Sequence, residues 1–305
     1  MNEFKKSLRR TGCITGLVVM AHLVVFQLLS GILMVVMIMA LDILGLMQLE
    51  AAILYIASDA AMLISGVIYL VFYLINRKAI SESSPQKGKI KLASIIKCII
   101  IILGVNAFLS AVNTIFSAVT GLSLTIPSVS AEGTNPWLLL VTVAVFPAVV
   151  EELIFRGVIY RYLRQHGTVF AAISSSLIFG LIHLNILQFL FAFAMGLVLC
   201  HIYERSGKLR YAMLLHFINN SIMVLANVLP VEAGIIIIIE CIAGIIAFVC
   251  GAVYLVIGKR RQGWILYSNS ESSGLWRKCR YFFTSVPMLL LVLLCVTICV
   301  FVMFI

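Results

Sequence analysis

The stretch VVEELIFRGVIY, residues 149–160, places two adjacent glutamates and an arginine inside a run that is otherwise almost wholly apolar. The chain has 305 residues, of which 63% are hydrophobic and only 11% are charged, whereas an ordinary soluble domain has about 25% charged residues. A charged side chain at bilayer depth costs at least about 2.5–3.5 kcal/mol. Glu151, Glu152 and Arg156 therefore need a compensating environment inside the protein, and they cannot face lipid.

Apolar runs long enough to cross a bilayer recur along the whole chain. A span takes about 20 residues, and nine such runs can be identified, at 16–40, 51–75, 92–118, 137–160, 169–184, 186–203, 211–229, 233–257 and 286–305. We therefore predict an all-α fold, a polytopic transmembrane helix bundle of about nine spans.

Basic residues gather in alternate connections between these runs. The N-terminus and the second, fourth, sixth and last connections hold 20 of the 22 Lys and Arg residues, and the connections at 41–50, 119–136, 184–185 and 228–232 hold none. This alternation is the positive-inside pattern, which places the N-terminus inside and, for nine spans, the C-terminus outside. The formal charge of +10 then faces anionic lipid headgroups rather than nucleic acid.

Three regions follow from the distribution of polar residues. Residues 1–136 form three N-terminal transmembrane helices and an external loop, residues 137–225 form a core, and residues 226–305 form two C-terminal transmembrane helices with a basic cytoplasmic loop. Polar residues at membrane depth concentrate at 147–220, so the core is the predicted functional region.

Helix geometry separates the two glutamates. Glu152 and Arg156 are spaced i and i+4 with the acid first, so they can form an ion pair on one helix face. Glu151 points about 100° away and has no partner in its own helix. Pro147 removes a backbone hydrogen bond and is expected to kink this helix, which is tolerated where the backbone lines a cavity.

Two later spans supply candidate partners for these carboxylates. In SLIFGLIHL, Phe179 and His183 are four residues apart, as are His216 and Asn220 in LLHFINN, so each pair shares one helix face. His183, His216 and Glu151 could hold a divalent metal such as zinc. Alternatively, the carboxylate acts as general base on a water while His and Asn stabilise an oxyanion. HExxH and GxSxG motifs are both absent.

Three short motifs together resemble a known family. EELIFR, FGLIH and HFINN are similar to the EExxxR, FxxxH and HxxxN motifs of the CPBP intramembrane proteases, which include the type II CAAX prenyl endopeptidase and bacterial abortive-infection and bacteriocin-immunity-like proteins. The resemblance covers about residues 137–225 and makes this region a protease core. It implies a multi-pass protein of the bacterial cell membrane.

The resemblance also implies a role for each motif residue. Glu151 would activate a water, with Glu152 and Arg156 supporting it. His183 and His216 would hold the water or a metal, and Asn220 would help form the oxyanion site, because Asn is an uncommon zinc ligand. The predicted function is an intramembrane endopeptidase, a metallo- or glutamate protease, that acts on a membrane-embedded or lipid-modified peptide, CAAX-like or bacteriocin-related, within an intramembrane cavity between kinked helices.

Two other classes of protein could use the same residues. In a non-catalytic membrane immunity or scaffold protein, they would hold the bundle together. In a transporter they would relay protons or bind a cation, although transporters favour repeated halves and no such repeat is visible. Convergence of Glu151, His183 and His216 on one cavity would favour catalysis over a scaffold.

The predicted spans leave one geometric conflict. At 1.5 Å per residue, Glu151 lies about 16 Å from the membrane boundary of its span, His183 about 22 Å and His216 only about 9 Å. One site cannot tolerate such a spread. Either Arg210 and Tyr211 lie deeper than the pattern suggests, or the helix that carries His183 begins outside the bilayer.

Some polar residues at membrane depth lie outside the motifs. Asp59, Lys97 and Glu240 are isolated charges, each of which indicates a functional or interhelical contact, and Glu240 could pair with Lys97. Asn219 does not share a face with His216, so it is expected to bond to the backbone or to a neighbouring helix.

Overall fold

The computed structural model is mostly helical over the residues that it describes, which are 3–86, 88–121, 134–228 and 274–302 with four isolated positions between 242 and 249. The predicted fold class, an all-α transmembrane bundle, is confirmed. The elements in chain order are α1 (Glu3–Leu44), η1 (Met47–Leu49), α2 (Glu50–Glu82), α3 (Leu92–Thr120), α4 (Pro136–Leu139), η2 (Leu140–Val145), α5 (Phe146–Glu152), η3 (Leu153–Tyr160), α6 (Arg161–Arg164), α7 (Thr168–Leu181), α8 (Ile186–Ser206), α9 (Leu209–Val228), α11 (Leu275–Phe283) and α12 (Val286–Val302).

Several of these helices are long and apolar enough to cross a membrane, so the chain is an integral membrane protein. Within the described residues there are five, and α11 and α12, bent by 81°, would together make a sixth. The predicted span 233–257 lies outside the described residues except for four isolated positions. The count of nine spans and the internal N-terminus therefore stay predictions.

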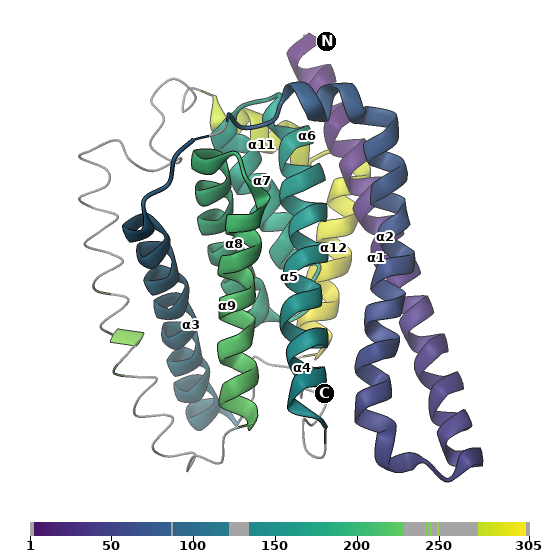
Figure 1. Ribbon diagram of the computed structural model, residues 1–305. Coiled ribbons are helices and arrows are strands. Elements are labelled where there is room, and N and C mark those ends of the chain that lie inside the picture. Colours follow the sequence, from purple (N-terminus) through teal and green to yellow (C-terminus); the bar gives the residue numbers. More distant parts are fainter. Residues whose placement is uncertain are drawn as a thin grey trace.

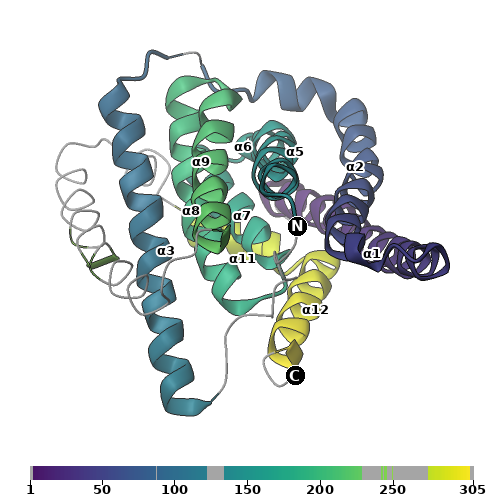
Figure 2. The same ribbon diagram turned by 60° about the horizontal axis from the view of Figure 1, so that its bottom comes forward.

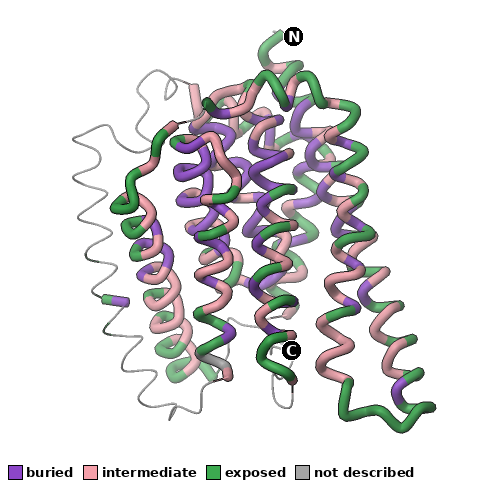
Figure 3. The backbone as a smooth tube through the Cα atoms, viewed as in Figure 1, coloured by how far each residue is buried: buried purple, intermediate pink, exposed green. Residues whose placement is uncertain are grey.

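The helices form a bundle in which the central span, the continuous run from α4 to α6, lies between two flanks. Figures 1 and 2 show α1 and α2 at one edge, α3 at the opposite edge, and α5, α7, α8 and α9 between them. Buried positions gather in the central helices, toward the end of the bundle where the N-terminus lies (Figure 3). The packed core thus surrounds the region that carries the three motifs.

The central span, α4 to α6, changes its helical register twice. Two of its segments, η2 and η3, are π-helical, a form that is rare and frequently found at functional sites. The register change in η2 directly precedes Pro147, and there the amide of Phe146 bonds to the carbonyl of Val141, five residues back. The missing amide of Pro147 is thus accommodated by a wider helical turn.

α7 and α8 form a short helical hairpin inside the bundle. The 14 residues of α7 extend about 21 Å, less than the roughly 30 Å of a hydrocarbon core. Leu184 and Asn185, which the charge pattern placed in an external connection, are buried. A Cβ on Gly196 of α8 would lie 2.8 Å from the Ser176 Cβ of α7, so the two helices approach closely. The turn that carries His183 therefore lies within the protein.

The start of α9 resolves the conflict in depth. A Cδ atom of Leu209, the first residue of α9, lies 3.5 Å from where a Cβ on Gly157 would be. α9 therefore begins beside the middle of η3 and not at the level of Arg164, seven residues further along. Arg210 and Tyr211 lie deeper than the hydropathy pattern suggests, which brings His216 to the level of the glutamates.

α1 packs against the junction of α11 and α12 through two small residues one turn apart. Gly12 meets the backbone carbonyl of Phe282, and a Cβ on Gly16 would lie 2.6 Å from the backbone nitrogen of Met288. Glycines four residues apart let membrane helices approach this closely.

Replacing Gly16 with leucine should therefore destabilise the bundle, by about 1–3 kcal/mol, because the new side chain meets backbone that cannot move aside. The free energy of unfolding by chemical denaturation in detergent measures this cost. Gly31 of the same helix has open space at its Cβ position, so Gly31→Leu is the matched control and should unfold like the wild type. Equal stability of the two variants would contradict the close approach of α1 to α12.

Candidate active site

Glu152 and Arg156 form a buried ion pair within the central span. The Nη1 atom of Arg156 lies 2.6 Å from Oε1 of Glu152, and both side chains are almost completely inaccessible to solvent. Arg156 also donates from Nη2 to the carbonyl of Gly196 at 3.3 Å, and its guanidinium lies 4.7 Å from the centre of the Phe179 ring. The arginine charge is thus met by a carboxylate, a carbonyl and an aromatic face.

His216 of α9 lies between the two adjacent glutamates. Its Nδ1 atom is 3.0 Å from Oε1 of Glu152 and its Nε2 atom is 3.7 Å from Oε2 of Glu151. The Glu152 side chain has no exposed surface, whereas that of Glu151 retains 15%. Glu152 therefore belongs to a fully buried network, whereas Glu151 keeps part of its surface outside the packed protein.

His183 joins the same cluster through Phe179. Its Nδ1 atom lies 2.7 Å from the Phe179 carbonyl, which can only accept, so Nδ1 donates and Nε2 remains unprotonated in the neutral ring. The Phe179 ring packs edge-on against His183 at 5.0 Å and against His216 at 6.1 Å. Glu151 and His216 each interact electrostatically with His183. Phe179 thus holds both imidazoles and the arginine.

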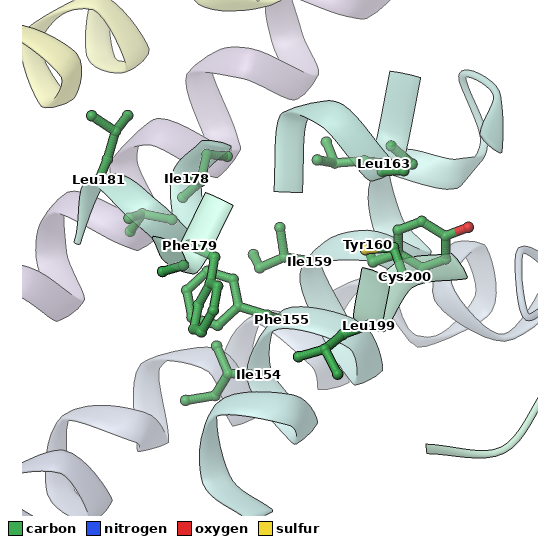
Figure 4. Close-up of a cluster of buried hydrophobic side chains, with 14 of the residues drawn as sticks. Ile154, Phe155, Ile159, Tyr160, Leu163, Ile178, Phe179, Leu181, Leu199 and Cys200 are labelled. Atoms are coloured by element: carbon green, nitrogen blue, oxygen red, sulfur yellow. The ribbon is translucent and has the colours of Figure 1, made fainter. Parts of the chain in front are cut away.

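An apolar shell surrounds this polar cluster. Figure 4 shows Phe155 and Phe179 side by side, with Ile154, Ile159 and Ile178 around them, and the two phenylalanine rings are 4.8 Å apart. Charged groups in such a shell interact more strongly than they would in water.

Asn220 makes a different contact from the one that the motif suggests. Its Nδ2 atom donates to the carbonyl of Val143 at 3.1 Å. Val143 precedes Pro147 by four residues, so its carbonyl is the one that an amide at 147 would bond to in an α-helix. Asn219, expected to bond to backbone or to a neighbouring helix, instead donates to Oδ1 of Asn220 at 3.1 Å. In this arrangement Asn220 caps the proline break, and its oxyanion role stays a prediction.

The candidate ligands Glu151, His183 and His216 meet only some of the requirements of a metal site. Each candidate histidine uses Nδ1 for an outer contact, His183 with a carbonyl and His216 with Glu152, as metal-binding histidines commonly do. Within the described part of the chain, however, no three His, Cys, Asp or Glu side chains are grouped closely enough to hold an ion. As placed, Glu151, His183 and His216 do not fit a metal, and zinc stays a prediction.

Several contacts were not foreseen from the sequence. Arg164 binds both carboxylate oxygens of Glu204, at 2.9 and 2.5 Å, and the Tyr160 hydroxyl donates to the same carboxylate at 2.7 Å. These residues lie 40 or more positions apart, so no local spacing indicates them. The contacts of Phe179 with Arg156 and both histidines were not predicted either, and the place of Phe179 in the FxxxH motif is the signal that could have indicated them.

The charged residues at membrane depth outside the motifs differ in what the structure shows of them. Glu240, and with it the suggested pair with Lys97, lies outside the described residues. Asp59 is half-buried in α2, and none of the hydrogen bonds or ion pairs found among the described residues involves it.

The region that carries the buried glutamates, histidines and arginine also matches a known protein family. Residues 133–222 match the family described as type II CAAX prenyl endopeptidase Rce1-like, and this match includes every predicted site residue. The resemblance inferred from the three motifs is thereby confirmed.

The similarity to one curated relative agrees with the family match. The chain is 31% identical over 98 residues to the "Putative membrane peptidase YdiL" of Bacillus subtilis (strain 168), a match that covers 32% of this chain and 40% of the relative. The chain thus spans well under half of the length of this relative. No solved structure matches the chain significantly.

The two adjacent glutamates should respond differently to neutralisation. Glu152→Gln leaves the buried Arg156 without its counter-charge, so the free energy of unfolding should fall by about 3 kcal/mol or more. Glu151→Gln changes a partly exposed side chain that lies 3.7 Å from its nearest ionic neighbour, so stability should change by less than about 0.5 kcal/mol. Chemical denaturation of both variants in the same detergent measures the difference, and equal losses would contradict the division of roles.

The contact between Asn220 and Val143 can be tested with a double-mutant cycle. Asn220→Ala should cost about 1 kcal/mol of stability, because a partly buried carbonyl loses a hydrogen-bond donor. In a Pro147→Ala background the cost should be smaller, since alanine restores the backbone amide. An equal cost in both backgrounds would show that Asn220 does not compensate for the proline.

Proposed function

We propose that this protein is an intramembrane endopeptidase that hydrolyses a peptide bond of a membrane-embedded or lipid-modified peptide. The observation that carries the proposal is the position of His216 between two glutamates, of which only Glu151 remains accessible. The family match over residues 133–222 supports the same class of reaction.

Glu151 is the general base in this proposal. Its carboxylate accepts a proton from a water as the water attacks the peptide carbonyl, and it then returns the proton to the leaving amine. Glu152 accepts the Nδ1 proton of His216 and is itself fixed by Arg156. This contact leaves Nε2 of His216 facing Glu151, where it can accept a hydrogen bond from the attacking water and orient it.

The second histidine completes the water site. Nδ1 of His183 is engaged by the Phe179 carbonyl, so Nε2 is the atom free to contact the water or the reacting carbonyl. The buried position of the cluster strengthens these interactions, because fixed dipoles replace bulk solvent around the developing charge. Asn220, once released from Val143 or through its second N–H, would donate to the oxyanion.

The scaffold alternative explains only part of the cluster. Glu152 and Arg156 form an ion pair, as structural residues would, although Oε2 of Glu152 and Nε of Arg156 have no partner among the described residues. Glu151 does not fit that interpretation, because a structural carboxylate in the membrane would be enclosed and hydrogen-bonded. It is instead partly exposed and too far from His216 for a hydrogen bond. Such a group is placed to act on a molecule from outside the chain.

The substrate class follows from the membrane setting and the family. The matching family is described by its CAAX prenyl endopeptidases, whose substrates are lipid-modified. A bacteriocin-related or other membrane-embedded peptide would reach the same buried cluster, so we propose the broader class of membrane-associated peptides, in a bacterial membrane like that of the Bacillus relative.

The proposal is tested by cleavage of candidate membrane peptides with the purified protein. Glu151→Gln should lower the rate about 10²–10⁴-fold, the usual contribution of a general base, and His183→Ala and His216→Ala should also lower it strongly. Asp59→Asn removes another intramembrane carboxylate outside the cluster and is the matched control, with activity expected to be unchanged. Mass spectrometry of the products gives both the rate and the bond that is cut.

Two further results would distinguish the alternatives. Full activity of Glu151→Gln would exclude the glutamate mechanism and favour a scaffold. Loss of wild-type activity with a chelator, restored by zinc, would show that a metal is required and that the cluster rearranges to bind it.

A further inference from the structure

Apart from the candidate active site, the molecule has an apolar groove on the side of the central span that faces α2. It lies between α2, from Met62 to Tyr73, and the outer face of the span, from Val150 to Arg161, and it has a volume of about 520 Å³. Sites that hold one small molecule have about 300–1,000 Å³. Glu152, Arg156 and His216 do not line the groove, so it is separate from the candidate active site.

The mouth of the groove faces the lipid phase. Leu63, Val67 and Leu70 on α2 are 55%, 52% and 55% exposed, and Leu153 on the span is 48% exposed. Large apolar side chains exposed on a membrane-crossing helix contact lipid tails and not water. The molecule that fills the groove must therefore come from the hydrocarbon core.

One end of the groove carries a positive charge, Arg161, that forms no ion pair with an acid in the part of the chain that the structure describes. Two other arginines of this span are paired, Arg156 with Glu152 and Arg164 with Glu204. Among the described residues, Arg161 donates hydrogen bonds to neutral groups, the carbonyl of Gly157 at 3.4 Å and the hydroxyl of Ser84.

The Nε atom of Arg161 adds to this mismatch, because it is buried and has no partner among the described residues. A partly buried charge without a counter-ion is costly, so an anion from outside the chain would stabilise it.

We propose that the groove holds one acyl chain of an anionic phospholipid, with the headgroup phosphate against Arg161. A guanidinium matches phosphate geometry well. The distance along the span from Arg161 to Val150 is about 16 Å, close to half of the roughly 30 Å hydrocarbon core, which is the depth of one leaflet. A lipid in this position supports the wall of the helix that carries the glutamates.

A glycine in the groove permits a direct test. A Cβ on Gly66 would meet nothing within 4 Å, so Gly66→Leu fills the groove without displacing protein atoms. Gly31 of α1 has the same open surroundings and does not line the groove, so Gly31→Leu is the matched control.

The experiment is native mass spectrometry of the detergent-purified full chain, titrated with phosphatidylglycerol or phosphatidylcholine. The wild type and Gly31→Leu should retain one phosphatidylglycerol in preference to phosphatidylcholine. Gly66→Leu should weaken phosphatidylglycerol binding by at least about tenfold. Arg161→Gln should remove the preference between the two lipids while some binding of both remains, and it provides a readout that does not depend on the fold of the Gly66 variant.

Several results would overturn the proposal. Equal affinity of the wild type for the two lipids would show that Arg161 does not select the headgroup. Equal lipid binding by Gly66→Leu and Gly31→Leu would show that the lipid does not occupy the groove. Displacement of the lipid by inorganic phosphate alone would show a free-anion site without an acyl chain. Lost peptide cleavage in Gly66→Leu with unchanged lipid binding would assign the groove to substrate instead.

Discussion

The buried contact among Arg156, Glu152 and His216 is the interaction on which the rest of the central region depends. A lone charge at this depth would cost several kcal/mol, and removing Glu152 or Arg156 leaves the charge of the other unmatched. The three side chains come from the central span and from α9, and the Gly196 carbonyl of α8 adds a further contact to the arginine. The network therefore joins three helices, and a different register between them would leave a charge buried alone.

The helices can meet at this point only because their backbones adapt. The π-helical stretches of the central span shift its register before and after the glutamates, and Asn220 supplies a donor to the carbonyl of Val143. The small residue Gly196 lets α8 come close to α7. These departures from regular helix geometry lie at the level of the cluster, which agrees with the general association of π-helical segments and function.

The sequence predicts the local part of this arrangement well and the long-range part poorly. The pair Glu152 and Arg156 follows from a spacing of four, and the motif histidines from their likeness to a family. The burial of the turn between α7 and α8 was not predicted, because hydropathy reports apolarity and not depth, and a buried turn looks like a short loop. The contacts of Arg164 with Glu204 and of Asn220 with Val143 join residues 40 and 77 positions apart. No spacing rule reaches that far without knowledge of which helices are neighbours.

Because Glu151 and Glu152 are adjacent in the sequence, one helix can provide two glutamates with such different surroundings. Consecutive residues on a helix point about 100° apart, so one carboxylate can enter the closed network while its neighbour faces the accessible side. An imidazole placed between them has two nitrogens on opposite sides of the ring and contacts both. The charge that is fixed by Arg156 thereby orients His216, and His216 in turn presents its second nitrogen to Glu151. A single pair of neighbouring residues thus links the stability of the bundle to the position of Glu151, the partly exposed carboxylate of the cluster.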